Sequence, residues 1–213
     1  MKVLILGSTG LVGSQLLELL LNDSKVSSVT AITRRELTKH NKLNNVISDL
    51  SNIEQLKELF KVDSLYCCLG TTIKTAGSKE SFRKIDYHYP LEAAQKLKEQ
   101  SPLGTYCIIS ALGANSKSSI FYNKVKGNIE DDLKSLDLNK LIIIRPSLLM
   151  GERKEKRFSE SLAISLMKVI NPMMLGPLKK YRGIAAQAVA KKMILETRKK
   201  SNGKLTIIEN DSI

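Results

Sequence analysis

The chain has 213 residues, of which 42% are hydrophobic and 26% charged, a composition that excludes intrinsic disorder and suits a globular domain with one substantial core. The net charge of +13 favours anionic partners, but Arg-Gly repeats, zinc-finger spacings and alternating basic and aromatic residues are lacking, so nucleic-acid binding is not favoured. No apolar run is long enough to span a membrane, and the apolar residues after Met1-Lys2 are too few for a secretory signal, so we expect a soluble, cytoplasmic protein.

Apolar runs and amphipathic segments alternate along the first two thirds of the chain. The short continuous runs predict strands buried on both faces, and apolar residues at helical spacing predict helices between them. The predicted strands are 3–6, 29–33, 46–47, 65–69, 105–110 and 141–144, and the predicted helices are 11–21, 53–60, 80–100 and 121–136. Strand followed by helix, repeated with short connections, is typical of an α/β protein with a Rossmann-type doubly wound parallel sheet.

The pattern changes after residue 146. Residues 151–157 predict a charged loop, 158–170 an amphipathic helix, 184–200 a long final helix and 205–208 a last strand that extends the edge of a sheet of about seven strands. These residues are too few for a large substrate domain of their own. We therefore expect one domain over 1–213, in which 151–200 form a small cap over the C-terminal edge of the sheet, on the substrate side.

Three glycines at intervals of three follow the first predicted strand and open the first helix. The segment reads Gly7, Ser8, Thr9, Gly10, Leu11, Val12, Gly13. Gly7 allows the tight turn, Gly10 lets the backbone approach a pyrophosphate, and Gly13 lets the helix pack closely, with the phosphates at the positive end of the helix dipole. The segment therefore predicts a dinucleotide-binding turn. A turn that serves packing alone is the alternative.

The second predicted strand ends in Thr33-Arg34-Arg35, where an NAD-specific site presents a carboxylate to the ribose. A guanidinium pairs with a 2′-phosphate and stacks on adenine, whereas a carboxylate repels that phosphate. Arg34 and Arg35 therefore predict binding of NADP(H). The alternative is two exposed loop arginines without a ligand.

Tyr122 and Lys126 lie four residues apart on a predicted helix, so they share one face of it. An ordinary phenol, with a pKa of about 10, exchanges protons poorly at neutral pH, and a nearby ammonium favours the phenolate. Ser110, at the end of the fifth predicted strand, is placed to position a substrate oxygen. The three residues predict a catalytic set in which Tyr122 passes a proton while hydride moves between cofactor and carbon.

Several segments resemble the atypical short-chain dehydrogenase/reductases of the Tat-interacting protein branch, over about residues 1–200. The segments are the glycine turn, 67–72, 76–78, 121–127 and Arg145-Pro146. The resemblance implies an NADP(H)-binding Rossmann fold. In that fold, Asp49 and Leu50 lie at the adenine, where a helix N-cap region is the alternative reading. The nicotinamide-ribose side is lined by Leu69, Gly70, Thr71 and Thr72, and Arg145 and Pro146 lead into the loop over the active site.

One position departs from the family pattern. Many active relatives carry an asparagine on the fourth helix, which links the lysine to a water chain, and the comparable position here is Asp86. A carboxylate holds a water equally well, but it changes the balance of charge around the lysine. The departure concerns proton relay more than cofactor binding.

The sequence is compatible with three functions. The first is an NADP(H)-dependent oxidoreductase that acts on a small carbonyl or alcohol through Ser110, Tyr122 and Lys126. The second is an NADP-sensing interaction protein with little or no turnover, which the basic C-terminal third and Asp86 leave open, with a protein as partner. The third is a nucleotide-sugar epimerase or dehydratase, which usually needs a larger C-terminal domain. We expect a small-molecule substrate, no metal and a monomer.

Overall fold

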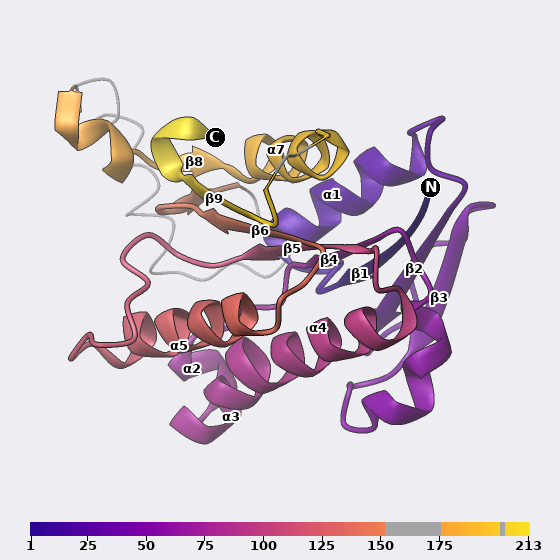
Figure 1. Cartoon of the computed structure of the whole chain (residues 1–213), viewed down its shortest axis with the longest axis horizontal. Coiled ribbons are helices and arrows are strands. Elements are labelled where there is room, and N and C mark those ends of the chain that lie inside the picture. The colour runs from indigo at the N-terminus through magenta and orange to yellow at the C-terminus, as the bar shows by residue number, and fades with distance from the viewer. Residues whose placement is uncertain (152–175, 201–202) are drawn as a thin grey trace.

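The computed structural model describes residues 1–151, 176–200 and 203–213, and its centre is a parallel sheet of seven strands (Figure 1). The strands lie in the order β3-β2-β1-β4-β5-β6-β9. Their bounds are β1 (Lys2–Leu6), β2 (Ser28–Thr33), β3 (Leu43–Ile47), β4 (Ser64–Cys67), β5 (Thr105–Ile109), β6 (Lys140–Arg145) and β9 (Leu205–Glu209). The strand order reverses between β1 and β4, as in a doubly wound Rossmann sheet, and this confirms the predicted fold class.

Helices cover both faces of the sheet (Figure 1). On one face lie α1 (Leu11–Leu21) and α7 (Ala186–Arg198), and on the other lie the 3-10 helix η1 (Ile53–Phe60), α4 (Tyr89–Gln100) and α5 (Phe121–Ser135). Alternate strand residues enter opposite cores: Val3 and Ile5 pack with α1, and Leu4 and Leu6 pack with α4. This two-sided burial explains why the strands read as continuous apolar runs.

The predicted helix over 80–100 is corrected to three joined segments. They are α3 (Lys79–Arg83), a π-helical turn η2 (Lys84–His88) and α4, preceded by the short helix α2 (Ile73–Ala76). Pro90 has no N–H to donate to the carbonyl of Asp86 four residues earlier, and its ring crowds that carbonyl. The N–H of Tyr89 donates instead to the carbonyl of Lys84, five residues back. The helix therefore widens at the position of Asp86.

The C-terminal third differs from the expected cap. Of the loop predicted over 151–157 only residue 151 is described, and the helix predicted over 158–170 lies outside the described residues. The helix predicted over 184–200 is α7, and it packs on the sheet face beside α1 rather than over the sheet edge. Its apolar stripe, which includes Val189, Ala190 and Met193, completes the core that α1 leaves open on that face. Strand β9 pairs with β6 at the sheet edge, as predicted.

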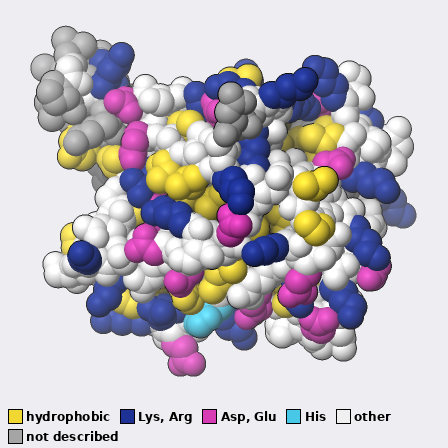
Figure 2. All heavy atoms as spheres, viewed as in Figure 1, with side chains coloured by type: hydrophobic (Ala, Val, Ile, Leu, Met, Phe, Trp, Pro, Cys, Tyr) yellow, Lys and Arg dark blue, Asp and Glu magenta, His cyan; other side chains and the backbone are white. Residues whose placement is uncertain are grey.

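Small elements and mixed charges complete the described surface. A two-stranded sheet joins β7 (Leu149–Met150) to β8 (Ile184–Ala185), and two 3-10 helices are η4 (Gly176–Tyr181) and η5 (Asn210–Ser212). Basic and acidic side chains are intermingled on the face that Figure 2 shows. None of the described helices is both long and apolar enough to cross a membrane.

Candidate active site

The glycine turn links the end of β1 to the beginning of α1, and two of its glycines are required by close backbone contacts. Gly7 has a φ of +77°, in the left-handed region, and a Cβ at this position would lie 2.6 Å from the backbone of Cys68. A Cβ on Gly13 would lie 2.1 Å from the carbonyl oxygen of Gly7. Side chains at either position would therefore force the turn away from β4 or from α1.

Gly10, the middle glycine of the turn, has fewer close backbone neighbours than Gly7 and Gly13. A Cβ on Gly10 would approach only the carbonyl oxygen of Gly7, at 3.3 Å, among the described residues. Gly10 is also the N-cap of α1, so no side chain caps the first turn of that helix. Nearby, the buried hydroxyl of Ser8 finds no hydrogen-bond partner among the described residues. Uncapped N–H groups and an orphaned hydroxyl beside a glycine with no side chain fit the diphosphate of a dinucleotide.

The two arginines predicted to select NADP(H) directly follow β2. Both side chains are exposed, while Thr33 before them is buried and donates its hydroxyl to the carbonyl of Arg35. Strand β2 is the neighbour of β1, so its carboxyl end lies beside the glycine turn. The arginines are thus on the side of the sheet where a ribose would follow the diphosphate.

The segment after β3 is held by its own contacts. Asp49 accepts the N–H of Ser51 at 2.8 Å, and hydrogen bonds from Ser51 hold the pKa of Asp49 below its ordinary value. Leu50 has a φ of +68°, unusual for leucine, and its side chain is buried in the core beneath α4. Asp49 is exposed, so its carboxylate keeps a lone pair for a ligand, whereas the Leu50 side chain serves packing.

The loop after β4 connects the glycine turn to the helices on the opposite face. Leu69 is half-buried, and Gly70 follows it with open space except for the Asp86 carboxylate, 3.7 Å from a Cβ built there. The N–H of Thr71 donates to Oδ2 of Asp86 at 2.9 Å. The hydroxyl of Thr72 accepts the N–H of Thr75 and caps α2. The Asp86 carboxylate therefore fixes this loop.

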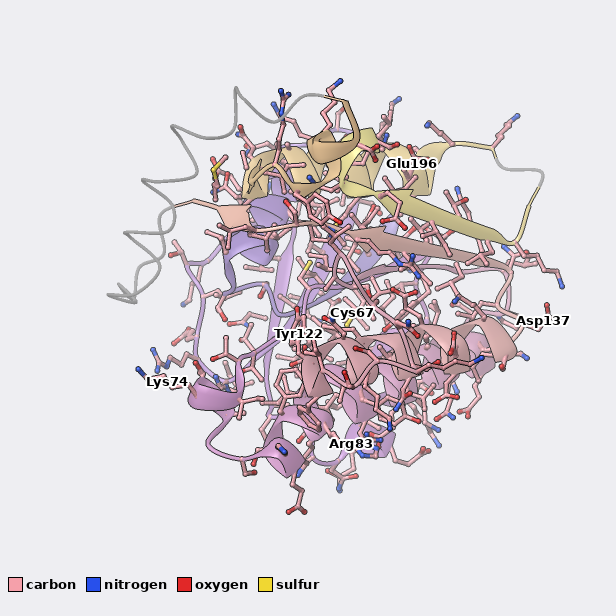
Figure 3. The ribbon with its side chains drawn as sticks, turned by 90° about the vertical axis from the view of Figure 1, so that its left-hand side faces the viewer. Cys67, Lys74, Arg83, Tyr122, Asp137 and Glu196 are labelled. Carbon is pink, nitrogen blue, oxygen red and sulfur yellow. The ribbon has the colours of Figure 1, made fainter. Side chains whose placement is uncertain are left out.

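Tyr122 and Lys126 lie in the first half of α5, as predicted. Tyr122 is 37% exposed, with its ring against Phe82, and in Figure 3 it marks the end of α5 opposite Asp137. Lys126 is only 4% exposed, and its Nζ forms an ion pair with Oδ1 of Asp86 at 2.8 Å. Burial alone would lower the pKa of Lys126, but the negative charge of Asp86 outweighs burial and raises it. Lys126 is therefore a charged lysine whose charge is already paired.

Ser110 follows β5, and its hydroxyl is bound to another side chain of the protein rather than being free to position a substrate. Its hydroxyl is buried and donates to Oε1 of Glu130 at 2.5 Å. Glu130 also pairs with Arg145, whose guanidinium reaches Glu209 as well. The Arg145 charge is thus committed to two carboxylates of the protein, and these bonds raise the pKa of Arg145. Pro146 after it is buried.

Glu130 is a site residue that the sequence reading missed. It lies four residues after Lys126 and eight after Tyr122, so the three residues form one stripe on α5. The sequence did contain a signal for it: Glu130 is an acidic residue on the buried side of a helix, at the same spacing as the two predicted site residues. Its partners are Ser110, directly after β5, and Arg145 at the end of β6, so Glu130 ties α5 to these two strand ends.

We expect Ser110→Ala to lower the free energy of unfolding by about 1.5–3 kcal/mol, because it removes one donor from the buried Glu130 carboxylate. Urea unfolding of both proteins measures this change. The control is Ser135→Ala, an exposed serine of α5, for which a change within about 0.5 kcal/mol is expected. Equal losses in the two variants would show that the bond to Glu130 contributes little.

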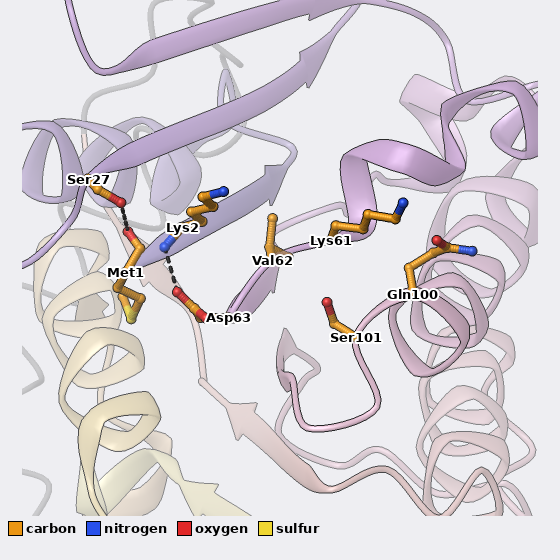
Figure 4. A pocket seen from close by; sticks show the side chains of 8 residues that line it. All are labelled: Met1, Lys2, Ser27, Lys61, Val62, Asp63, Gln100 and Ser101. Atoms are coloured by element: carbon orange, nitrogen blue, oxygen red, sulfur yellow. Dashed lines mark hydrogen bonds between the residues drawn. The ribbon is translucent and has the colours of Figure 1, made fainter.

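A hollow at the other end of the sheet is a different site. It lies among Met1, Lys2, Ser27, Lys61, Val62, Asp63, Gln100 and Ser101 (Figure 4). These residues precede β1, β2, β4 and β5 or begin them, so they lie at the amino ends of parallel strands. Ligands of doubly wound sheets bind at the carboxyl ends. The hollow is therefore remote from the glycine turn.

The sheet order, the glycine turn at the switch point and the Tyr-x-x-x-Lys pair on α5 define a Rossmann-fold protein of the atypical short-chain dehydrogenase/reductase type. Solved structures with this fold include a short chain dehydrogenase family protein from Francisella tularensis, at a TM-score of 0.70 and 15% identity, covering 98% of this chain and 97% of that one. BdcA in complex with NADPH matches at 0.70 and 15% identity over 99% of this chain and 93% of its own.

The chain belongs to the HIM1 family, whose model matches residues 18–176. It is 36% identical to the mitochondrial protein FMP52 of Debaryomyces hansenii, over 90% of this chain and 85% of that protein. It is 34% identical to the protein HTATIP2 of Rattus norvegicus, over 76% of this chain and 68% of that protein. The resemblance inferred from the sequence motifs is thereby confirmed.

These relatives also correct the expected location. FMP52 of Debaryomyces hansenii and of Candida albicans, the latter 34% identical over 96% of this chain and 91% of that protein, are both named as mitochondrial. The expectation of a cytoplasmic protein was wrong because it used only the lack of a hydrophobic secretory signal. Mitochondrial targeting depends on amphipathic, arginine-rich and serine-rich segments, which that criterion does not test.

Proposed function

We propose that the protein is an NADP(H)-dependent oxidoreductase that interconverts a small carbonyl compound and its alcohol, with Tyr122 as the proton-transferring residue. One observation carries the proposal: contacts run without a break from the glycine turn to the buried lysine. Gly7 contacts the backbone of Cys68, the loop that follows is bound to Asp86, and Asp86 is paired with Lys126. The dinucleotide turn and the Tyr122–Lys126 pair thus belong to one site.

Tyr122 and Lys126 have different roles in the proposed reaction. The glycine turn, Arg34 and Arg35 would hold NADPH, which would supply a hydride with its two electrons to the carbonyl carbon and leave as NADP⁺. The hydroxyl of Tyr122, exposed at the start of α5, gives its proton to the carbonyl oxygen and completes the alcohol. The resulting phenolate regains a proton from solvent, which its exposure allows. Lys126, one turn further along the same face of α5, holds a positive charge near the phenol and would be the residue that hydrogen-bonds the ribose of a bound cofactor.

Ser110 has a smaller part in this proposal than in the sequence reading. Its hydroxyl hydrogen is engaged by Glu130, so it does not donate to a substrate oxygen in this arrangement. Its contribution is to hold the end of β5 against α5. Tyr122 and Lys126 remain the proposed catalytic residues.

The preference for NADP(H) rests on Arg34 and Arg35, and nucleotide titration tests it. We expect the protein to quench and shift NADPH fluorescence at lower concentrations than NADH. Replacing both arginines by glutamine should weaken NADPH binding about 10- to 100-fold, the value of one or two charge-assisted hydrogen bonds to the 2′-phosphate, and leave NADH binding unchanged.

Lys39→Gln is the matched control, because Lys39 is an exposed basic residue of the same loop. It should leave both affinities as they are. Tighter binding of NADH than of NADPH by the unaltered chain would refute the assignment of the arginines. Absence of binding of either nucleotide would refute the proposed function as a whole.

A further inference from the structure

Asp86 is held in an unusual backbone element that turns its side chain inward. The π-helical turn η2 surrounds it, and Pro90 explains why the helix departs from α-helical pairing at this place. The Asp86 side chain is 1% exposed. A carboxylate is costly to bury without partners, so its partners indicate what it does.

Each carboxylate oxygen of Asp86 has its own partner. Oδ1 lies 2.8 Å from Nζ of Lys126, and Oδ2 accepts the N–H of Thr71 at 2.9 Å. One contact is to the proposed catalytic helix, and the other is to the loop beside the glycine turn. Asp86 therefore joins the lysine to the nucleotide side of the site, and it places a full negative charge against the lysine ammonium.

The other groups around Lys126 leave this charge balance in place. Cys67 of β4 and Tyr122 of α5 are the further titratable groups whose charges act on it. Burial raises the pKa of Cys67, so its thiol is neutral near physiological pH. Phe82 of α3 is uncharged and packs against the Tyr122 ring. The ammonium of Lys126, which interacts electrostatically with Tyr122, is thus cancelled by a carboxylate within contact distance.

The two directions of the proposed reaction need opposite forms of Tyr122. Carbonyl reduction needs a phenol that gives a proton to the oxygen, whereas alcohol oxidation needs a phenolate that takes one. An unopposed ammonium nearby favours the phenolate, and an ion pair with little net charge does not.

We propose that Asp86 is a positioning residue that biases the site toward carbonyl reduction, by cancelling the Lys126 charge so that Tyr122 keeps its proton near neutral pH. This inference rests on the proposed function for its chemical meaning. The geometry of the buried pair and the Thr71 contact carry it, and its first consequence is measurable without turnover.

The test is the ultraviolet absorbance of the Tyr122 phenolate during a pH titration, obtained by subtracting the same titration of Tyr122→Phe. We expect the unaltered chain to show no Tyr122 phenolate at neutral pH. In Asp86→Asn, whose amide oxygen can still accept the Thr71 N–H, the phenolate should appear about 1–3 pH units lower, because an ammonium without a counter-charge is left nearby. The acidic limb of the pH profile for alcohol oxidation, along which the rate rises as the phenolate forms, should move by the same amount.

Further variants separate charge from damage to the fold. In Lys126→Met, the remaining Asp86 charge should move the phenolate to higher pH than in the unaltered chain. In the double variant Asp86→Asn/Lys126→Met, which lacks both charges, it should return close to the original value. Asp131→Asn, at an exposed aspartate of the same helix, should change nothing.

Two results would overturn the inference. One is the observation of a Tyr122 phenolate at neutral pH in the unaltered chain. This measurement does not require that the variants of Asp86 or Lys126 fold. The other is a folded Asp86→Asn protein whose phenolate appears at the original pH. If the phenolate moves as expected but no carbonyl or alcohol is turned over with either cofactor, the charge relation stands and the proposed function fails.

Discussion

Tyr122→Phe is expected to lower the turnover number for carbonyl reduction by about 10²- to 10⁴-fold, because it removes the hydroxyl that gives the proton to the developing oxyanion. The affinity for NADPH should stay unchanged, because Tyr122 lies at the start of α5, whereas the diphosphate is proposed to bind at the glycine turn. Turnover is measured by NADPH oxidation with a panel of small aldehydes and ketones, and affinity by nucleotide fluorescence.

The matched control is Tyr89→Phe, a half-buried tyrosine of α4 whose ring lies under the ammonium of Lys84. It should keep full turnover. The same measurements separate an enzyme from an NADP-sensing interaction protein, because a sensor would bind its nucleotide and its partner equally well without the Tyr122 hydroxyl. Undiminished turnover in Tyr122→Phe would remove Tyr122 from the mechanism.

The sheet and the glycine turn were predictable because their signals are local. Burial on both faces of β1 and β6 leaves apolar runs that predict strands directly, and the three glycines of the turn lie within seven residues of one another. The position of α7 was not predictable in this way. Its apolar stripe shows that one side is buried, but the choice between the sheet face and the sheet edge depends on the space that α1 leaves.

Within the candidate site, the placement of Tyr122 and Lys126 on one face of a helix was predictable, and the contacts between distant residues were not. Tyr122 and Lys126 follow from a spacing of four on one helix. The engagement of Ser110 by Glu130, and the cancellation of Lys126 by Asp86, join residues 20 and 40 positions apart in sequence. Such pairs depend on how α5 meets β5 and η2, and the widened turn at Asp86 depends in addition on a missing N–H at Pro90. Of these contacts, the pair of Asp86 and Lys126 is the one proposed to set the charge near Tyr122.

The buried ion pair itself has a large expected effect on stability. Lys126→Met should lower the free energy of unfolding by about 3–5 kcal/mol, because it leaves the Asp86 carboxylate buried with only the Thr71 N–H as partner. The double variant Asp86→Asn/Lys126→Met should recover most of this loss, because the neutral amide needs no counter-charge and its oxygen still accepts the Thr71 N–H. Urea unfolding of the single and double variants measures both changes.

Lys124→Met is the matched control, since Lys124 is an exposed lysine on the same helix, and it should change stability by no more than about 0.5 kcal/mol. A double variant no more stable than Lys126→Met would mean that the unpaired, buried Asp86 carboxylate is not the cause of the loss in the single variant. A single variant as stable as the unaltered chain would mean that water reaches Asp86 and solvates its charge. The solvated carboxylate would then interact too weakly with Lys126 to change the protonation of Tyr122. The Asp86 inference therefore requires both a loss of stability in Lys126→Met and a shift of the phenolate titration in Asp86→Asn.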